Sequence, residues 1–174
     1  MKAKYSQGNC DNLCGVYASI NAALLSTEGL AKFSRKQVRN WFQLIIADLS
    51  KHRKLLEVHK VGSSVELVEG YLNTIREQLA KNIELTYYRP FTFKTRTSTA
   101  LKKLSAISQQ SNKAVIIGIE GFYDHWSLVS KITSDRVFLN DSDGLKFLNI
   151  KNMPNRYALT VEDTIVVKAE AVSK

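Results

Sequence analysis

The chain has 174 residues, of which 44% are hydrophobic and 24% are charged, and its formal net charge is +9. This composition is that of a globular protein and excludes a collagen-like or low-complexity chain, and the length suits one domain. We therefore expect a single domain over residues 1–174, with a helical part at about 14–80 and a sheet part at about 83–170.

Part of the positive charge is concentrated between residues 32 and 60. Such a run can attract nucleic acid, or it can simply be the solvated face of helices. We expect the solvated face and no nucleic-acid partner, because the run lacks the interleaved aromatic residues of a base-stacking surface and no nucleic-acid motif appears. The basic residues are Lys32, Arg35, Lys36, Arg39, Lys51, Arg53, Lys54 and Lys60.

The sequence contains only two cysteines, Cys10 and Cys14. A disulfide between them would close a very small loop, so two free thiols and a reducing compartment are expected. The three histidines have no metal-ligand spacing with the cysteines, and we expect no metal or other cofactor. The sequence has no signal-peptide pattern and no apolar run near the ~20 residues that span a bilayer. We expect no membrane span, and a cytoplasmic location or export without a cleavable signal; the oligomeric state stays open.

Apolar periodicity predicts helices in the first half of the chain. Residues 15–25 are rich in Ala, Leu and Ile, and residues 35–49 carry apolar side chains at helical spacing after a serine that can act as N-cap. Ser63 or Ser64 is expected to cap a further helix, and Glu66, three residues after Ser63, fits a capping box.

The second half predicts strands separated by turn residues, with one short helix at 99–110. Ser134-Asp135 and Asp143-Gly144 are expected to form hairpin turns. Helices followed by strands predict an α+β fold. The expected strands are residues 83–88, 114–119, 125–132, 136–140, 146–150 and 164–169.

Cys14 is the first candidate for chemistry. It precedes a good helix-forming segment, so it should lie at a helix N-terminus, where unpaired amides and the helix dipole favour a thiolate. Gly15 is expected to let a substrate carbonyl approach closely, because glycine has no side chain. A buried structural cysteine is the alternative.

His125 and Asp141 complete a candidate triad. His125 begins a predicted strand, and Asp141 follows the next one. A turn centred on Ser134 and Asp135 would bring Asp141 back beside His125, where a carboxylate can orient the imidazole and stabilise its charged form. Asn140 or Asp143 could take this place instead, and each residue alone could be structural.

Together these segments resemble the papain-like clan of cysteine peptidases, and within it the C39 bacteriocin-processing family and its C39-like relatives. The resemblance implies a papain-like α+β fold, with an N-terminal helical lobe packed on a C-terminal antiparallel sheet and an active site in the cleft between them. It implies that Gln7 helps to bind the oxyanion, that no cofactor is needed and that the substrate is a protein or peptide. The resembling segments are Gln7 to Ala22, Asp124-His125-Trp126, and Asn140-Asp141 with Gly144.

The resulting hypothesis is a cysteine hydrolase that cleaves amide or peptide bonds through a thioester acyl-enzyme. Two alternatives stay open: a papain-like glutamine deamidase or transglutaminase that modifies partner proteins, and a non-catalytic basic binding module. Cys10 is a rival nucleophile, although it is not followed by a good helix start.

Overall fold

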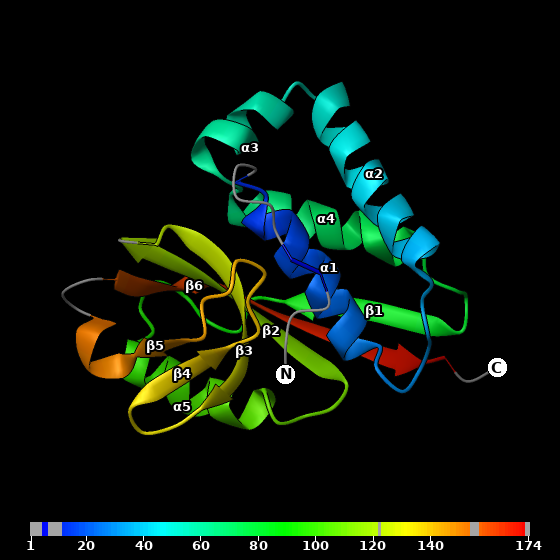
Figure 1. The fold of residues 1–174 in the computed structure, drawn as a ribbon. Helices are drawn as coiled ribbons and strands as arrows, with labels where there is room; N and C mark the ends of the chain where they lie inside the picture. Colours follow the sequence, from blue (N-terminus) through cyan, green and yellow to red (C-terminus); the bar gives the residue numbers. More distant parts are fainter. Residues whose placement is uncertain (1–4, 7–11, 122, 154–156, 173–174) are drawn as a thin grey trace.

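The computed structural model describes residues 5–6, 12–121, 123–153 and 157–172, and these form an α+β architecture (Figure 1). The helices are α1 (Cys14–Ser26), α2 (Arg35–Lys51), α3 (Leu55–Val61), α4 (Val65–Glu77) and α5 (Thr97–Ile107), with a 3-10 turn at Ile150–Asn152. The strands are β1 (Ile83–Tyr88), β2 (Lys113–Gly121), β3 (His125–Ile132), β4 (Arg136–Leu139), β5 (Phe147–Asn149) and β6 (Tyr157–Ala171). The predicted α+β class is confirmed.

The strands form one antiparallel sheet in the order β1-β6-β2-β3-β4-β5. Side chains of β2 alternate between two apolar cores, because successive strand residues point to opposite faces. Ala114 and Ile116 pack in the core between the sheet and helices α1, α2 and α4. Val115 and Ile117 pack in the core between the sheet and α5. In Figure 1, α1, α2 and α4 lie together above the sheet and α5 lies below it.

Serine caps fix where α2 and α4 begin. Ser34 forms a capping box with Gln37, as its position before an apolar repeat allows. The N-cap of α4 is Ser64, whose side chain accepts from the backbone N–H of Leu67. The capping box expected from Ser63 is therefore wrong, and the side chain of Ser63 turns inward instead.

Helix α3 and most of β6 were not predicted. Helix α3 has only seven residues and one buried side chain, Val58, so it carries almost no periodic signal. Strand β6 begins well before the expected residue 164.

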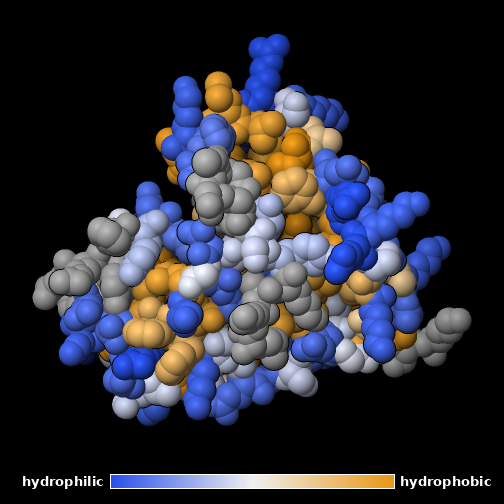
Figure 2. All heavy atoms as spheres, in the orientation of Figure 1, coloured by the Kyte–Doolittle hydropathy of each residue, from blue (hydrophilic) through white to orange (hydrophobic). Residues whose placement is uncertain are grey.

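Figure 2 shows apolar residues at the surface near α2 and α3, where Leu56 and Val61 are exposed. The basic residues between 32 and 60 are all exposed, as predicted.

Candidate active site

Cys14 is the first residue of α1, and its side chain is buried under the rest of the helical layer. Leu13 occupies the N-cap position and carries no side-chain oxygen, so it cannot cap the first-turn amides of α1. Because Cys14 is the first residue of α1, it lies at the positive end of the helix dipole. The side-chain amide of Asn12 donates through Nδ2 to the backbone carbonyl of His59 at 2.7 Å, and this hydrogen bond links the segment before Cys14 to α3.

Gly15 serves packing rather than an open approach to the sulfur. A Cβ on Gly15 would lie 2.8 Å from Cβ of Ser63 and 3.1 Å from Cγ2 of Val68. Real Cβ atoms do not approach other atoms so closely, so α1 can reach the loop before α4 only because residue 15 has no side chain. The surroundings of Gly15 therefore indicate a role in packing α1 against Ser63 and Val68, and not the expected role in admitting a substrate carbonyl.

The β3–β4 hairpin brings His125 and Asp141 together. Ile132 pairs with Val137 across the predicted turn, and an irregularity between Val129 and Lys131 shifts the register by one residue. Nε2 of His125 then lies 2.7 Å from Oδ2 of Asp141. Because a carboxylate only accepts hydrogen bonds, Nε2 carries the proton, which leaves Nδ1 for the side chain of Cys14.

The carboxylate of Asp141 is held from both sides. Its Oδ1 accepts from the backbone N–H of Asp143 at 2.8 Å and of Leu145 at 3.1 Å, while Oδ2 faces His125. Burial raises the pKa of Asp141, but its contacts with His125 and the backbone outweigh burial, so the net shift is downward. Of the three residues considered for this place, Asp141 contacts the histidine. Asp143 supplies its backbone N–H to the same carboxylate.

His125 is stabilised in its charged form. Its side chain is 11% exposed and that of Asp141 is 1% exposed. Burial lowers the pKa of His125, but the hydrogen bonds with Asp141 and with Cys14 outweigh this effect and raise the pKa to about 10. A charged imidazole between a carboxylate and a sulfur is the arrangement that supports a thiolate–imidazolium pair.

A small pocket of about 160 Å³ opens beside Cys14 and His125. A substrate carbonyl in this pocket would lie next to both side chains, so the pocket joins the candidate nucleophile to its candidate base. Gln7 and Cys10 lie outside the described residues. The pocket is lined by Cys14, Val61, Gly62, Ser63, Gly118, Ile119, Glu120, Asp124, His125, Trp126, Thr160 and Asp163.

Trp126 fastens the two sides of this pocket together, which sequence reasoning missed. Its buried Nε1–H donates to the carbonyl of Ser63 at 2.7 Å, across 63 positions in the sequence. Oγ of Ser63 lies 3.1 Å from the hydroxyl of Tyr71 in α4. Burial raises the pKa of Tyr71, which keeps its hydroxyl neutral as a donor or acceptor. The strand that begins at His125 is thereby tied to the helical layer that holds Cys14.

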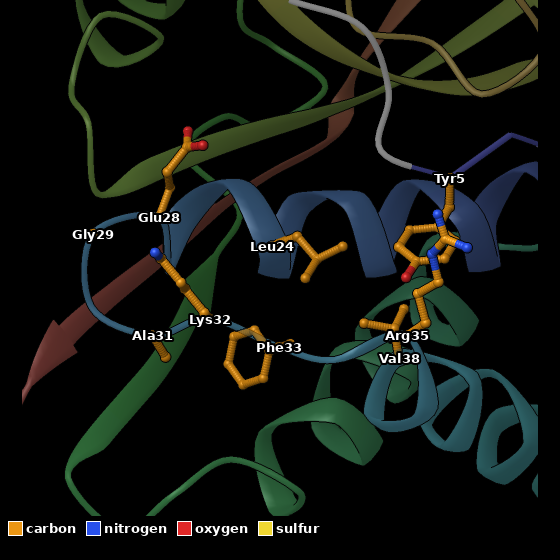
Figure 3. A pocket seen from close by; sticks show the side chains of 9 residues that line it. All are labelled: Tyr5, Leu24, Glu28, Gly29, Ala31, Lys32, Phe33, Arg35 and Val38. Carbon is orange, nitrogen blue, oxygen red and sulfur yellow. The ribbon is translucent and has the colours of Figure 1, made fainter.

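A larger pocket of about 680 Å³ lies between α1, the following loop and the start of α2 (Figure 3). Figure 3 shows Lys32 near Glu28 on one side of the pocket and Arg35 near Tyr5 on the other, with Leu24 of α1 between them. Among the described residues that line it, none is cysteine, histidine or serine, so they supply no pair of a thiol or hydroxyl with an imidazole. Cys14 and His125 line the smaller pocket instead.

Within the described residues, no helix is both long and apolar enough to cross a membrane. No protein-family model matches the sequence, and no curated protein is similar enough in sequence to match it.

Two solved structures are similar to this chain over nearly its whole length. One is a double glycine motif protease from an AMS/PCAT transporter in complex with the leader peptide, with 15% identity, a TM-score of 0.51, and coverage of 98% of this chain and 94% of that one. The other is the peptidase domain of Streptococcus ComA, a bi-functional ABC transporter involved in quorum sensing, with 11% identity, a TM-score of 0.50 and coverage of 97% of both chains. These similarities confirm the expected papain-like α+β fold, which this chain shares with the two peptidase structures.

Proposed function

We propose that this chain is a C39-like cysteine hydrolase that cleaves an amide or peptide bond, with Cys14 as nucleophile, His125 as base and Asp141 as the residue that orients the histidine. The observation that carries the proposal is the position of His125, which hydrogen bonds to Asp141 at 2.7 Å and whose pKa is raised by its contacts with Asp141 and Cys14. The similarity in fold to two peptidase domains supports the same class of reaction.

In the proposed mechanism, Nδ1 of His125 takes the thiol proton of Cys14, and the thiolate attacks the carbonyl carbon of the scissile bond. The C–S bond forms while the carbonyl oxygen gains negative charge. The backbone N–H of Cys14 and the side chain of Gln7 stabilise this oxyanion, each contributing about 3–4 kcal/mol if well placed.

Collapse of this intermediate breaks the C–N bond, and the imidazolium of His125 gives its proton to the leaving amine. Water, activated by the now neutral histidine, hydrolyses the thioester and restores the thiol. Asp141 keeps the proton of the imidazole on Nε2 throughout, so that Nδ1 alone exchanges protons with the reacting atoms.

The substrate is proposed to be a peptide segment, because one of the similar structures is a protease bound to a leader peptide. The pocket beside Cys14 is small, which suits a segment with little side-chain volume at the scissile bond. The same neighbour acts on a double glycine motif, so internally quenched peptides with a central Gly-Gly are the first probes.

The test is a cleavage assay on those peptides with wild type, Cys14→Ala, His125→Ala and Cys10→Ala. The proposal expects cleavage after the motif, loss of it in the first two variants and retention in Cys10→Ala. A covalent peptide adduct on Cys14, seen by mass spectrometry of quenched reactions, would identify the acyl-enzyme. Cleavage that survives Cys14→Ala would contradict the proposal. Ammonia release from glutamine peptides without cleavage would favour the deamidase alternative.

A further inference from the structure

Ser127 lies two residues after His125 in β3, and its hydroxyl is buried without a partner. The residue is 1% exposed, and its Oγ makes no hydrogen bond within the described part of the chain. Native proteins rarely leave a buried hydroxyl unpaired, because its lost hydration is then not replaced. We propose that Ser127 is a positioning residue, whose hydroxyl donates to the carboxylate of Asp141 and keeps it charged and turned toward His125. This inference rests on the proposed function, because it concerns the same triad.

The pairing of β3 with β4 places Ser127 across from Asp141. Val129 pairs with Leu139, and the residue after Leu139 donates its backbone N–H to the carbonyl of Leu128 at 2.8 Å. The same register, continued by one more residue, sets Ser127 opposite Asp141, and alternation directs both side chains to one face. The Cβ atoms of residues directly opposite lie about 4.5–5.5 Å apart, so a serine hydroxyl there is within reach of a carboxylate oxygen.

The carboxylate of Asp141 has one place left for this donor. A carboxylate offers about four acceptor positions, two on each oxygen. The backbone N–H groups of Asp143 and Leu145 take both positions on Oδ1, whereas among the described residues Oδ2 accepts only from Nε2 of His125. Rotation of Ser127 about its Cα–Cβ bond, between staggered positions, would bring its hydroxyl to the open position on Oδ2 without moving the backbone.

The surroundings of Ser127 favour Asp141 as the acceptor. On the side of β2, Ser127 pairs with Ile117, whose side chain has no polar atom. Asn140 also has a buried, unpartnered Oδ1, but it is the neighbour of Asp141 in the chain, so alternation directs its side chain to the opposite face. Ser127 is not among the described residues that line the pocket beside Cys14. It can therefore act on the reaction only through Asp141.

A hydroxyl at this place also suits the charge of the carboxylate. Burial raises the pKa of Asp141, and its hydrogen bond with His125 and the charge of that residue lower it. The side chain of Ser127 lowers the pKa of Asp141 further. A donor to the charged form of a carboxylate stabilises that form, which matters here because the side chain of Asp141 is only 1% exposed. An ionised and fixed carboxylate in turn holds the proton of the imidazole on Nε2.

The experiment follows the charge of Asp141 directly, by a pH titration of its carboxyl carbon in NMR spectra of the labelled protein. The signal is identified by its absence from the spectrum of Asp141→Asn. In Ser127→Ala, which removes only the hydroxyl, we expect the midpoint of the Asp141 titration to move to higher pH, because the charged form loses a donor. The midpoints of the other aspartates should stay unchanged.

Ser142→Ala is the matched control. Ser142 is also a buried serine with an unpartnered Oγ, but it follows Asp141 in the chain and does not lie across from it in the strand pairing. Its variant should therefore keep the midpoint that Asp141 has in wild type. An unchanged midpoint in Ser127→Ala, or an equal rise in Ser142→Ala, would overturn the inference.

The titration requires no bond cleavage, so its result is separable from the test of the proposed function. A midpoint that rises in Ser127→Ala, in a chain that cleaves no peptide, keeps the hydrogen bond and contradicts only the proposed function. For a peptide that is cleaved, Ser127→Ala should lower kcat about threefold to tenfold with little change in KM, because Ser127 does not line the pocket. Cleavage with an unchanged midpoint or an unchanged kcat in Ser127→Ala would contradict only the role of Ser127.

Discussion

Nε2 of His125 lies 2.7 Å from Oδ2 of Asp141, and this contact joins the first residue of β3 to the loop that follows β4. Two backbone N–H groups hold the other oxygen of the carboxylate, so its position does not depend on the histidine. The hairpin therefore presents a pre-oriented imidazole to the N-terminus of α1.

Asp141→Asn should lower kcat/KM for a cleaved peptide by roughly 10³-fold or more, because the amide no longer fixes the proton on Nε2 or stabilises the imidazolium. The fold should survive, since the replacement keeps the size of the side chain. Initial rates with a quenched peptide substrate, together with circular dichroism, provide the measurement.

Asp143→Asn is the matched control. Asp143 is exposed and contributes its backbone N–H, which the substitution keeps. Activity that falls equally in both variants, or that persists in Asp141→Asn, would show that Asp141 does not orient the base.

The pH dependence of stability should report the charge on His125. Its pKa in the folded state is about 10, above the ordinary value of 6.5, so folding favours the protonated form. The stabilisation from this charge is fully present below pH 6.5 and is lost as the pH rises through about 10. The difference in free energy of unfolding between wild type and His125→Gln, from urea titrations, should therefore shrink between pH 6.5 and 10. A difference that stays constant between pH 6.5 and 10 would show that folding does not raise the pKa of His125.

Gly15→Ala should destabilise the fold by about 1–3 kcal/mol, because the new methyl would overlap Cβ of Ser63 and approach Val68. In an ordinary helix the same change is stabilising, so the sign itself is diagnostic. Ser63→Gly removes the atoms in conflict, and the double variant should recover part of the loss. Simple additivity of the two single variants, measured by thermal unfolding, would mean that the two positions do not interact.

Trp126→Phe should cost about 1–3 kcal/mol, because it leaves the buried carbonyl of Ser63 without its donor. It should also slow alkylation of Cys14, since the tie between β3 and the helical layer is lost. Trp41→Phe, which shortens a buried ring in α2, is the control for lost volume alone. Equal alkylation rates in the two variants would show that the Trp126 contact does not position the site.

Local chemistry explains what the sequence predicted correctly. The turn at Ser134 and Asp135 is specified by adjacent residues, so the pairing of Ile132 with Val137 and the return of Asp141 to His125 followed from it. The start of α2 was equally local, because Ser34 and Gln37 cap it by themselves. These features need no knowledge of distant contacts.

The features that the sequence did not predict depend on distant parts of the chain. Ser63 or Ser64 was expected to cap α4, and Ser64 does so, whereas the capping box from Ser63 does not form. Ser63 instead packs against Gly15 and accepts from the indole of Trp126 through its carbonyl. The register of β6 against β2 shifts between Ile116 and Gly118, and this shift is defined only by the pairing of the two strands. Neither the contacts of Ser63 nor the register shift of β6 produces a periodic pattern or a turn motif in the sequence. The residues that line the pocket could therefore be identified only from the structure.

The central claim is that Cys14 is a nucleophile activated by His125. The most direct test is the rate of iodoacetamide alkylation at Cys14 against pH, in wild type and His125→Ala, with Cys10 as the internal reference and the adducts located by mass spectrometry. We predict rapid labelling of Cys14 well below pH 8.5, where an ordinary thiol is mostly protonated, and a marked slowing of that labelling in His125→Ala. Slow labelling that is equal at both cysteines and unaffected by His125→Ala would contradict the account.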